Sequence, residues 1–275
     1  MYTFDPDRYG KLDHIILIGC GGTGSHIIAA IAQLIYTLDK SGYDTPQLTL
    51  IDPDTLDIHN AGRQRFTVAE CEQRLPKANV LAQRYNFALG LNIKAIPEHF
   101  AAKRINHHPY QRHNNSTIII GAVDNTAARA TINNLEMDIV WIDAGNAAET
   151  GQIIVGNTNN PENLRLPENG KQKNVLRYLP NAGLIYPELV QPELKPTNPT
   201  PSASCAERIR YNAQNPIINQ MIAAATSIYV YKLILKIPLT GHITHIDTKS
   251  LNVRTPLIDP HTWPLPNTRP TTQNA

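Results

Sequence analysis

The stretch Gly19-Cys20-Gly21-Gly22-Thr23-Gly24-Ser25 decides the fold of this 275-residue chain. The apolar run His14 to Ile18 leads into it, and residues 23–38 follow it with apolar side chains at helical spacing. Glycines between a strand and a helix let backbone N–H groups approach a phosphate, and the positive end of the helix favours an anion. We therefore expect Gly19, Gly21, Gly22 and Gly24 to form a nucleotide site. The alternative is a tight turn without a ligand.

Strands and helices alternate along the first half of the chain. Besides the strand and helix around the glycines, the pattern predicts strands at 47–51, 93–96, 117–123, 139–143 and 152–155, and helices at 68–89 and 127–137. Such alternation is typical of βαβ units. We therefore predict an α/β fold with a Rossmann-like, mainly parallel sheet and flanking helices.

The second half of the chain is richer in proline and shows less periodicity. Prolines interrupt residues 157–204, which we predict to be a long crossover loop without regular structure, between a nucleotide-binding core at 1–156 and a C-terminal part at 205–255. That part should complete the same domain with a long apolar helix, opened by Asn215-Pro216, and a hairpin at 243–254. Residues 256–275 read as a proline-rich tail.

Composition excludes several classes of function. A net charge of +2 without a basic run argues against a nucleic-acid partner, and the most apolar segment, 221–237, is shorter than a membrane span of about 20 residues. The three cysteines share no C-x-x-C spacing, so we expect neither a disulfide framework nor a structural zinc site. The N-terminus has no secretory signal pattern. We therefore expect a cytoplasmic protein with no membrane partner.

Charged residues gather where the predicted strands end. Asp52 ends the second strand and is the candidate for ribose hydroxyls, with Asp54 as a weaker candidate. Asn60, Arg63, Gln64 and Lys77 follow, and a reaction at a phosphate needs such cations to neutralise charge on its oxygens. The alternative is an ordinary charged loop and a solvated helix face.

Asp124 and Asn125 follow the apolar strand at 117–123 and should reach the same edge of the sheet. Mg²⁺ is usually bound by one or two carboxylates together with substrate phosphates. We therefore predict that Asp124 holds Mg²⁺ and that Asn125 lies in the same site. The alternative is that Asp124 only caps the next helix.

The combined motifs resemble the ThiF/MoeB/HesA family of adenylating enzymes, which activate ubiquitin-like and sulfur-carrier proteins. The motifs here are the glycine loop, Asp52-Pro53-Asp54 with Asn60 and Arg63-Gln64, Lys77, Val123-Asp124-Asn125 with Arg129, and Trp141-Ile142-Asp143-Ala144-Gly145. Within the family, the chain is similar to the members encoded in PRTRC gene clusters.

The resemblance implies ATP-dependent adenylation of the C-terminal carboxylate of a small β-grasp protein, with Mg²⁺ and with Arg63, Lys77 and Asp124 as catalytic residues. It also implies a homodimer. Some relatives go on to form a thioester on a cysteine. Here Cys205 would take that role, in a sequence that also fits a helix start, and a conjugating enzyme would be the acceptor.

Two other functions stay open from the sequence. An NAD-dependent oxidoreductase would share the glycine loop, and its Tyr-x-x-x-Lys spacing occurs at Tyr36 and Lys40, but it leaves Arg63, Lys77 and Asp124 unexplained. A non-enzymatic nucleotide-binding scaffold subunit would be expected to lose those charged residues.

Overall fold

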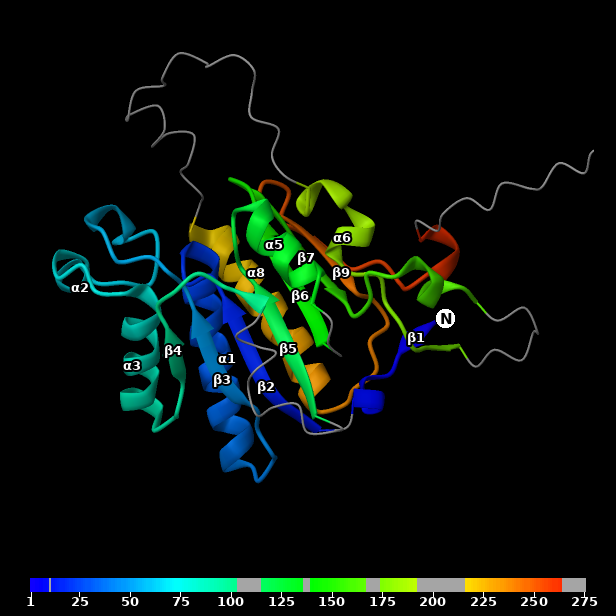
Figure 1. The fold of residues 1–275 in the computed structure, drawn as a ribbon, viewed down its shortest axis with the longest axis horizontal. Coiled ribbons are helices and arrows are strands. Elements are labelled where there is room, and N and C mark those ends of the chain that lie inside the picture. Colours follow the sequence, from blue (N-terminus) through cyan, green and yellow to red (C-terminus); the bar gives the residue numbers. More distant parts are fainter. Residues whose placement is uncertain (10, 103–114, 136–138, 167–173, 192–215, 264–275) are drawn as a thin grey trace, which may run out of the picture.

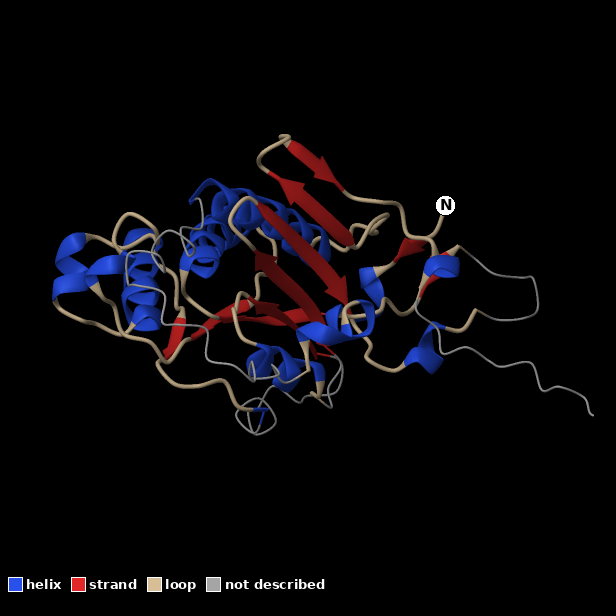
Figure 2. Ribbon diagram, turned by 90° about the horizontal axis from the view of Figure 1, so that it is seen from above, coloured by secondary structure: helices blue, strands red, loops and turns tan. Residues whose placement is uncertain are grey.

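The computed structural model describes residues 1–9, 11–102, 115–135, 139–166, 174–191 and 216–263. Within them, helices cover both faces of a twisted central sheet (Figures 1 and 2). The α/β fold with a mainly parallel central sheet, as predicted, is confirmed.

The central sheet has the strand order β10-β9-β7-β6-β5-β2-β3-β4. Its strands are β2 (Lys11–Ile18), β3 (Gln47–Ile51), β4 (Lys94–Ile96), β5 (Asn115–Gly121), β6 (Ile139–Asn146), β7 (Thr150–Gly156), β9 (Ile243–Asp247) and β10 (Asn252–Arg254). The strands from β4 to β6 pair in parallel, and those from β6 to β10 pair antiparallel. The strand pairing therefore changes from parallel to antiparallel at the β6–β7 pair. The predicted closing hairpin is confirmed as β9 and β10.

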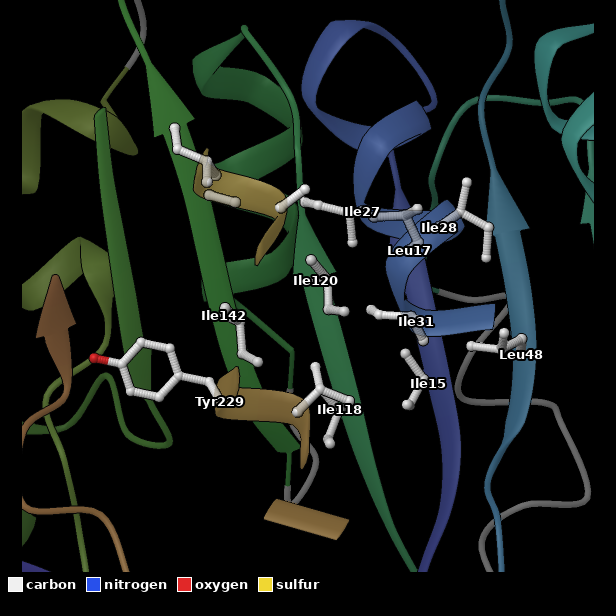
Figure 3. Packing of buried hydrophobic residues seen from close by; sticks show 14 of the residues in the cluster. Ile15, Leu17, Ile27, Ile28, Ile31, Leu48, Ile118, Ile120, Ile142 and Tyr229 are labelled. Carbon is white, nitrogen blue, oxygen red and sulfur yellow. The ribbon is translucent and has the colours of Figure 1, made fainter. Parts of the chain in front are cut away.

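The helices are α1 (Gly22–Lys40), α2 (Val68–Glu72), α3 (Lys77–Leu89), α5 (Thr126–Asn133), α6 (Ala182–Ile185) and α8 (Pro216–Ile234). Successive side chains of the inner strands point to opposite faces and form two buried clusters. In one, Ile15 and Leu17 of β2 pack toward Ile27 and Ile31 of α1 (Figure 3). In the other, Ile16 and Ile18 lie on the face covered by α5 and α6. Both faces of the inner parallel strands are therefore buried.

The single helix predicted over residues 68–89 is wrong. The chain forms α2 after the Thr67 cap, turns through Arg74 at φ 51°, and begins α3 after Pro76. Pro76 has no backbone N–H and disfavours a helical residue before it, so a continuous helix is excluded there. The break matters because it places Lys77 in the first turn of α3.

The crossover segment holds more structure than predicted over its described parts, residues 157–166 and 174–191. It contains 3-10 helices at Pro161–Leu164 and Pro187–Leu189, the helix α6, and the strand β8 (Val175–Leu176). β8 pairs in parallel with β1 (Thr3–Phe4), which was not predicted. β8 escapes a sequence pattern because it depends on long-range pairing, and the short helices are too short to show helical periodicity. Residues 192–215, including Cys205 and its predicted helix start, lie outside the described residues.

The long apolar helix α8 packs along α1 and against β6, β7 and β9. Among the described residues, it is the one helix that is long and apolar enough to cross a bilayer by those two criteria. Ile218, Ile222 and Val230 on its inner side are buried, as is usual for a core helix that passes the same test. α8 therefore completes the core over the antiparallel half of the sheet.

Candidate functional site

A cavity of about 660 Å³ opens at the edge of the sheet where β2, β3 and β5 end. Among the predicted site residues that the structure describes, all except Gly22 and Gly24 line it. Those that line it are Gly19, Gly21, Asp52, Asp54, Asn60, Arg63, Gln64, Lys77, Asp124 and Asn125. Residues separated by about one hundred positions in the sequence thus converge on one cavity.

The glycines of the loop serve different purposes. At Gly19, φ is +91° and an added Cβ would overlap the carbonyl group of Ala122. At Gly24, an added Cβ would overlap the carbonyl group of Gly19, so Gly24 lets α1 approach the loop. At Gly21, an added Cβ would meet nothing within 4 Å. Gly21 is therefore the glycine with open space beside it, whereas Gly19 and Gly24 are required by packing.

The loop leads into the start of α1, where backbone donors are available. Gly21 is the N-cap residue and carries no side-chain cap, and α1 begins at Gly22. The first N–H groups of a helix have no partner within the helix, and they carry the positive end of its dipole. This edge of the cavity consequently suits an anionic group such as a phosphate.

Asp52 ties the glycine loop to the end of β3. Its two carboxylate oxygens accept hydrogen bonds from the backbone N–H groups of Cys20 and Asp54. Burial raises the pKa of Asp52 above its usual value, and these hydrogen bonds partly offset that effect. Asp52 thus has a clear structural role, and the predicted contact with ribose stays a prediction.

Lys77 is held in the wall of the cavity by Asp54. Its Nζ lies 2.8 Å from Oδ2 of Asp54, and its side chain is only 8% exposed, against 63% for Asp54. The backbone N–H of Lys77 also donates to the carbonyl oxygen of Asp54. The first turn of α3 and the turn after β3 therefore fix this ammonium group together, which the sequence did not predict.

The segment between β3 and α2 supplies Asn60, Arg63 and Gln64. Asp57 and Asn60 form a reciprocal cap on the 3-10 helix Ile58–Asn60, with Oδ1 of Asn60 accepting from the N–H of Asp57. Gln64 is buried, and its Oε1 has no hydrogen-bond partner in the described part of the chain. A buried amide oxygen that is unpaired beside a cavity is a point where a ligand can donate a hydrogen bond.

Asp124 and Asn125 reach the cavity after β5. The helix cap predicted as an alternative role for Asp124 belongs to Asn125, whose Oδ1 accepts from the N–H of Ala128. Asp124 is exposed and stays free for another role. Within the described ranges, no group of three His, Cys, Asp or Glu side chains could hold a metal ion alone. A single carboxylate such as that of Asp124 suits Mg²⁺ only when a ligand supplies the other oxygens.

The cavity wall also contains a buried ion pair. Nε of Arg129 donates to Oδ1 of Asp143 at 2.8 Å, and the two side chains are 9% and 0% exposed. Burial raises the pKa of Asp143, and the guanidinium of Arg129 opposes this shift. Arg129 belongs to the family motif quoted above, but the sequence alone assigned it no role.

A polar contact joins the start of α1 to the end of β6 and to α8. The hydroxyl of Thr23 lies 3.0 Å from Oδ1 of Asn146 and from Oδ1 of Asn219, and Nδ2 of Asn146 donates to Asn219. These residues were missed by the sequence analysis. The sequence offers one signal, an amide side chain at Asn219 within a largely apolar helix. Such an amide needs a hydrogen-bond partner when it is buried, and Asn219 is fully buried.

A second cavity of about 610 Å³ adjoins the first and shares Arg129 and Asn146 with it. It lies over the antiparallel strands, with Gly145, Gly151, His245 and Arg254 among its lining residues. The two cavities together provide space for two ligands that meet at the end of β6.

The cysteines described by the structure, Cys20 and Cys71, are free and buried. Burial raises the pKa of both thiols, and the Asp52 carboxylate adds to this effect at Cys20. Neither thiol is suited to form a thiolate at neutral pH. The predicted role of Cys205 stays a prediction, because Cys205 lies outside the described residues.

Comparisons with known proteins give one family and one fold. The ThiF family profile matches residues 5–263. The "Ubiquitin-activating enzyme E1-like" protein of Saccharomyces cerevisiae is 28% identical over 162 residues, which are 55% of this chain and 23% of the yeast protein. The chain thus spans about a quarter of that relative.

Among solved structures, E. coli MccB superposes with a TM-score of 0.56 at 14% identity, covering 92% of this chain and 64% of MccB. The structure of MccB with ATP gives a TM-score of 0.57 at 15% identity, covering 92% and 65%. PaaA gives a TM-score of 0.53 at 13% sequence identity, covering 92% of this chain and 66% of PaaA. At these identities the likeness concerns the fold, and each solved protein is longer than the part that this chain matches.

Proposed function

Because this chain belongs to the ThiF family, we propose that it is an adenylating enzyme, which uses ATP to activate the carboxylate of a substrate. The observation that carries the proposal is the composition of the larger cavity. An open backbone at Gly21, the start of α1, the ammonium group of Lys77 and the carboxylate of Asp124 all line it. This set suits a triphosphate.

The proposed reaction begins with the attack of a carboxylate oxygen on the α-phosphorus of ATP. A bond forms between that oxygen and phosphorus, the bond from phosphorus to the bridging oxygen breaks, and pyrophosphate leaves with the electron pair. The products are an acyl-adenylate and pyrophosphate. A C-terminal carboxyl group has a pKa of about 3.5 and is ionised at neutral pH, so the reaction needs no general base.

Catalysis then consists of positioning and charge neutralisation. The loop and the start of α1 would bind phosphate oxygens, Lys77 and Arg63 would neutralise charge on them, and Asn60 would donate to them. Bound Mg²⁺, held by Asp124 and the phosphates, would supply further neutralisation. Lys77 is already fixed by Asp54 at 2.8 Å, so little reorganisation is required of it.

We propose that the substrate is the C-terminal tail of a small β-grasp protein of the ubiquitin-like or sulfur-carrier type. The second cavity would hold the tail, because it joins the ATP cavity at Arg129 and Asn146. E. coli MccB, which shares the fold, has been solved with MccA. A homodimer, a thioester on Cys205, transfer to a conjugating enzyme, a cytoplasmic location and the likeness to PRTRC cluster members remain proposals of the same kind.

The geometry does not favour the oxidoreductase. Tyr36 and Lys40 lie in the last turns of α1, where Nζ of Lys40 stands 5.3 Å from the centre of the Tyr36 ring. At 1.5 Å per helical residue, Tyr36 is about 22 Å from the glycine end of α1. That distance is too long for a catalytic contact at the cavity.

The test is ATP–pyrophosphate exchange by the purified chain with Mg²⁺ and a panel of small β-grasp proteins, followed by intact mass measurement. We expect exchange that depends on one partner, and a partner mass increased by one adenylate. Partner binding without exchange or adenylate would instead support the scaffold function. Absence of ATP binding would refute the proposed site.

A further inference from the structure

The two cavities meet at a buried arginine, Arg129. We propose that Arg129 recognises the free carboxylate of the substrate at the boundary between the cavities. This inference rests on the proposed function and deepens it, since it assigns a residue to substrate recognition. It predicts a substrate with a chain-terminal carboxylate, and it excludes the corresponding amide.

The hydrogen bonding of Arg129 leaves part of its guanidinium group available. Its Nε donates to Oδ1 of Asp143, and Oδ2 of Asp143 has no hydrogen-bond partner in the described part of the chain. The ion pair is therefore made through one nitrogen. Among the described residues, no further partner of Arg129 is recorded, although its side chain is 91% buried and lines both cavities. An arginine has five N–H donors, so its two terminal nitrogens remain for a ligand.

The surroundings of Arg129 fix its position. An added Cβ on Gly145 would stand 3.3 Å from Nη2 of Arg129, so this glycine leaves room for the guanidinium. Asn146, the other residue shared by the two cavities, is held by Thr23 and Asn219. A fixed guanidinium presents parallel N–H groups that match the two oxygens of a carboxylate.

The chemistry needs a cation at this position. Two anions, the carboxylate and the triphosphate, must come together before the oxygen–phosphorus bond forms. As that bond forms, negative charge leaves the carboxylate and moves onto the phosphate oxygens. Contacts to the carboxylate are consequently strongest before the reaction, so Arg129 should affect the binding of the substrate more than the rate constant of the bound complex.

A purely structural role makes a different prediction. If Arg129 only neutralised Asp143, then changing either residue alone would have similar consequences. If Arg129 recognises the carboxylate, Asp143→Asn should keep recognition, because Oδ1 of Asn can still accept from Nε and the positive charge of Arg129 is retained. The two roles are therefore separable by matched substitutions.

The experiment measures binding of two peptides by calorimetry, with the ATP analogue AMPCPP and Mg²⁺ present. The probes are one hexapeptide ending in Gly-Gly as the free acid, and the same hexapeptide as the carboxamide. The proteins are the full chain, Arg129→Lys, Asp143→Asn, the double variant Arg129→Met with Asp143→Leu, and the control Arg165→Met. The double variant replaces the buried pair with apolar residues, which avoids leaving one charge unpaired. Arg165 is an exposed arginine that lines neither of the two cavities.

We expect the wild type, Asp143→Asn and Arg165→Met to bind the acid more tightly than the amide, on the order of 10- to 100-fold, because a charge-assisted hydrogen-bond pair is lost with the amide. We expect this preference to be reduced in Arg129→Lys, which keeps the positive charge but not the parallel N–H groups, and to disappear in the double variant. Equal binding of both peptides by the wild type, or binding of neither, would overturn the inference, as would an acid preference that survives in the double variant. A wild type that does not bind AMPCPP would refute the proposed function itself, which is a separate result.

Discussion

Two alanine substitutions in the glycine loop should have opposite effects, one on the stability of the protein and the other on ATP binding. In Gly24→Ala, the new Cβ overlaps the carbonyl oxygen of Gly19 and stands 2.8 Å from its carbon, against 3.4–4 Å for an ordinary contact. Both atoms belong to the backbone and the oxygen is the nearer of the two, so α1 must move away from the loop by about 1 Å or more. Overpacking of this kind costs about 1–3 kcal/mol. In Gly21→Ala, the Cβ meets nothing within 4 Å, and the stability of the free protein should change by less than about 0.5 kcal/mol.

The same pair separates folding from nucleotide binding. Gly21→Ala places a methyl group in the open space beside the loop, so it should weaken ATP binding on the order of 10-fold or more, as when a hydrogen bond to a charged group is lost. Thermal unfolding without ATP measures the change in stability, at about 2–4 °C in melting temperature per kcal/mol. Calorimetric titration with ATP and Mg²⁺ measures the change in ATP affinity. If Gly21→Ala were as unstable as Gly24→Ala, or bound ATP like the wild type, our assignment of the open glycine would be refuted.

Three further predictions concern the site and the fold. Lys77→Ala should lower pyrophosphate exchange by about 10²–10³-fold, whereas Lys40→Ala, at the other end of α1, should leave it unchanged; near-full exchange by Lys77→Ala would contradict the proposed role. Burial lowers the pKa of His242 from 6.5 to about 4, so the unfolded chain takes up this proton first as the pH falls, and about 3 kcal/mol of stability should be lost between pH 6.5 and 4. Denaturant unfolding should show this loss diminished in His242→Asn, which cannot titrate, and an unchanged pH profile would argue against it. Thr67→Ala removes the cap of α2 and should cost about 1 kcal/mol of unfolding free energy, and denaturant midpoints that match the wild type would count against that cap.

Local patterns predicted the elements with strong periodicity. Strand β3 has the predicted bounds of Gln47–Ile51, and the glycine loop joins a strand to a helix as expected. Asp52, Asp124 and Asn125 were predicted from one rule, that parallel strands end at the same edge of a sheet. That rule fixes which end of each strand a residue occupies, and this is enough to bring distant residues into one cavity. Asn60, Arg63, Gln64 and Lys77 were predicted instead from the charge neutralisation that a reaction at a phosphate requires.

Pairwise contacts were not predictable in the same way. The ion pairs of Lys77 with Asp54 and of Arg129 with Asp143 depend on which side chains face each other after packing. The break before α3 was missed, although Pro76 marks it in the sequence. The pairing of β1 with β8 joins residues more than 170 positions apart, and no local pattern encodes such a contact.

The hydrogen bond between Thr23 and Asn219 has a consequence for biosynthesis, since it joins residues 196 positions apart. The first turn of α1 leaves the ribosome long before α8 is translated, so the side of α1 that later packs against α8 stays uncovered in the meantime. Contacts of such long sequence separation form slowly. A nascent chain that stops before α8 would therefore expose apolar surface beside an unfinished nucleotide loop, and it would be a target for chaperones and for aggregation.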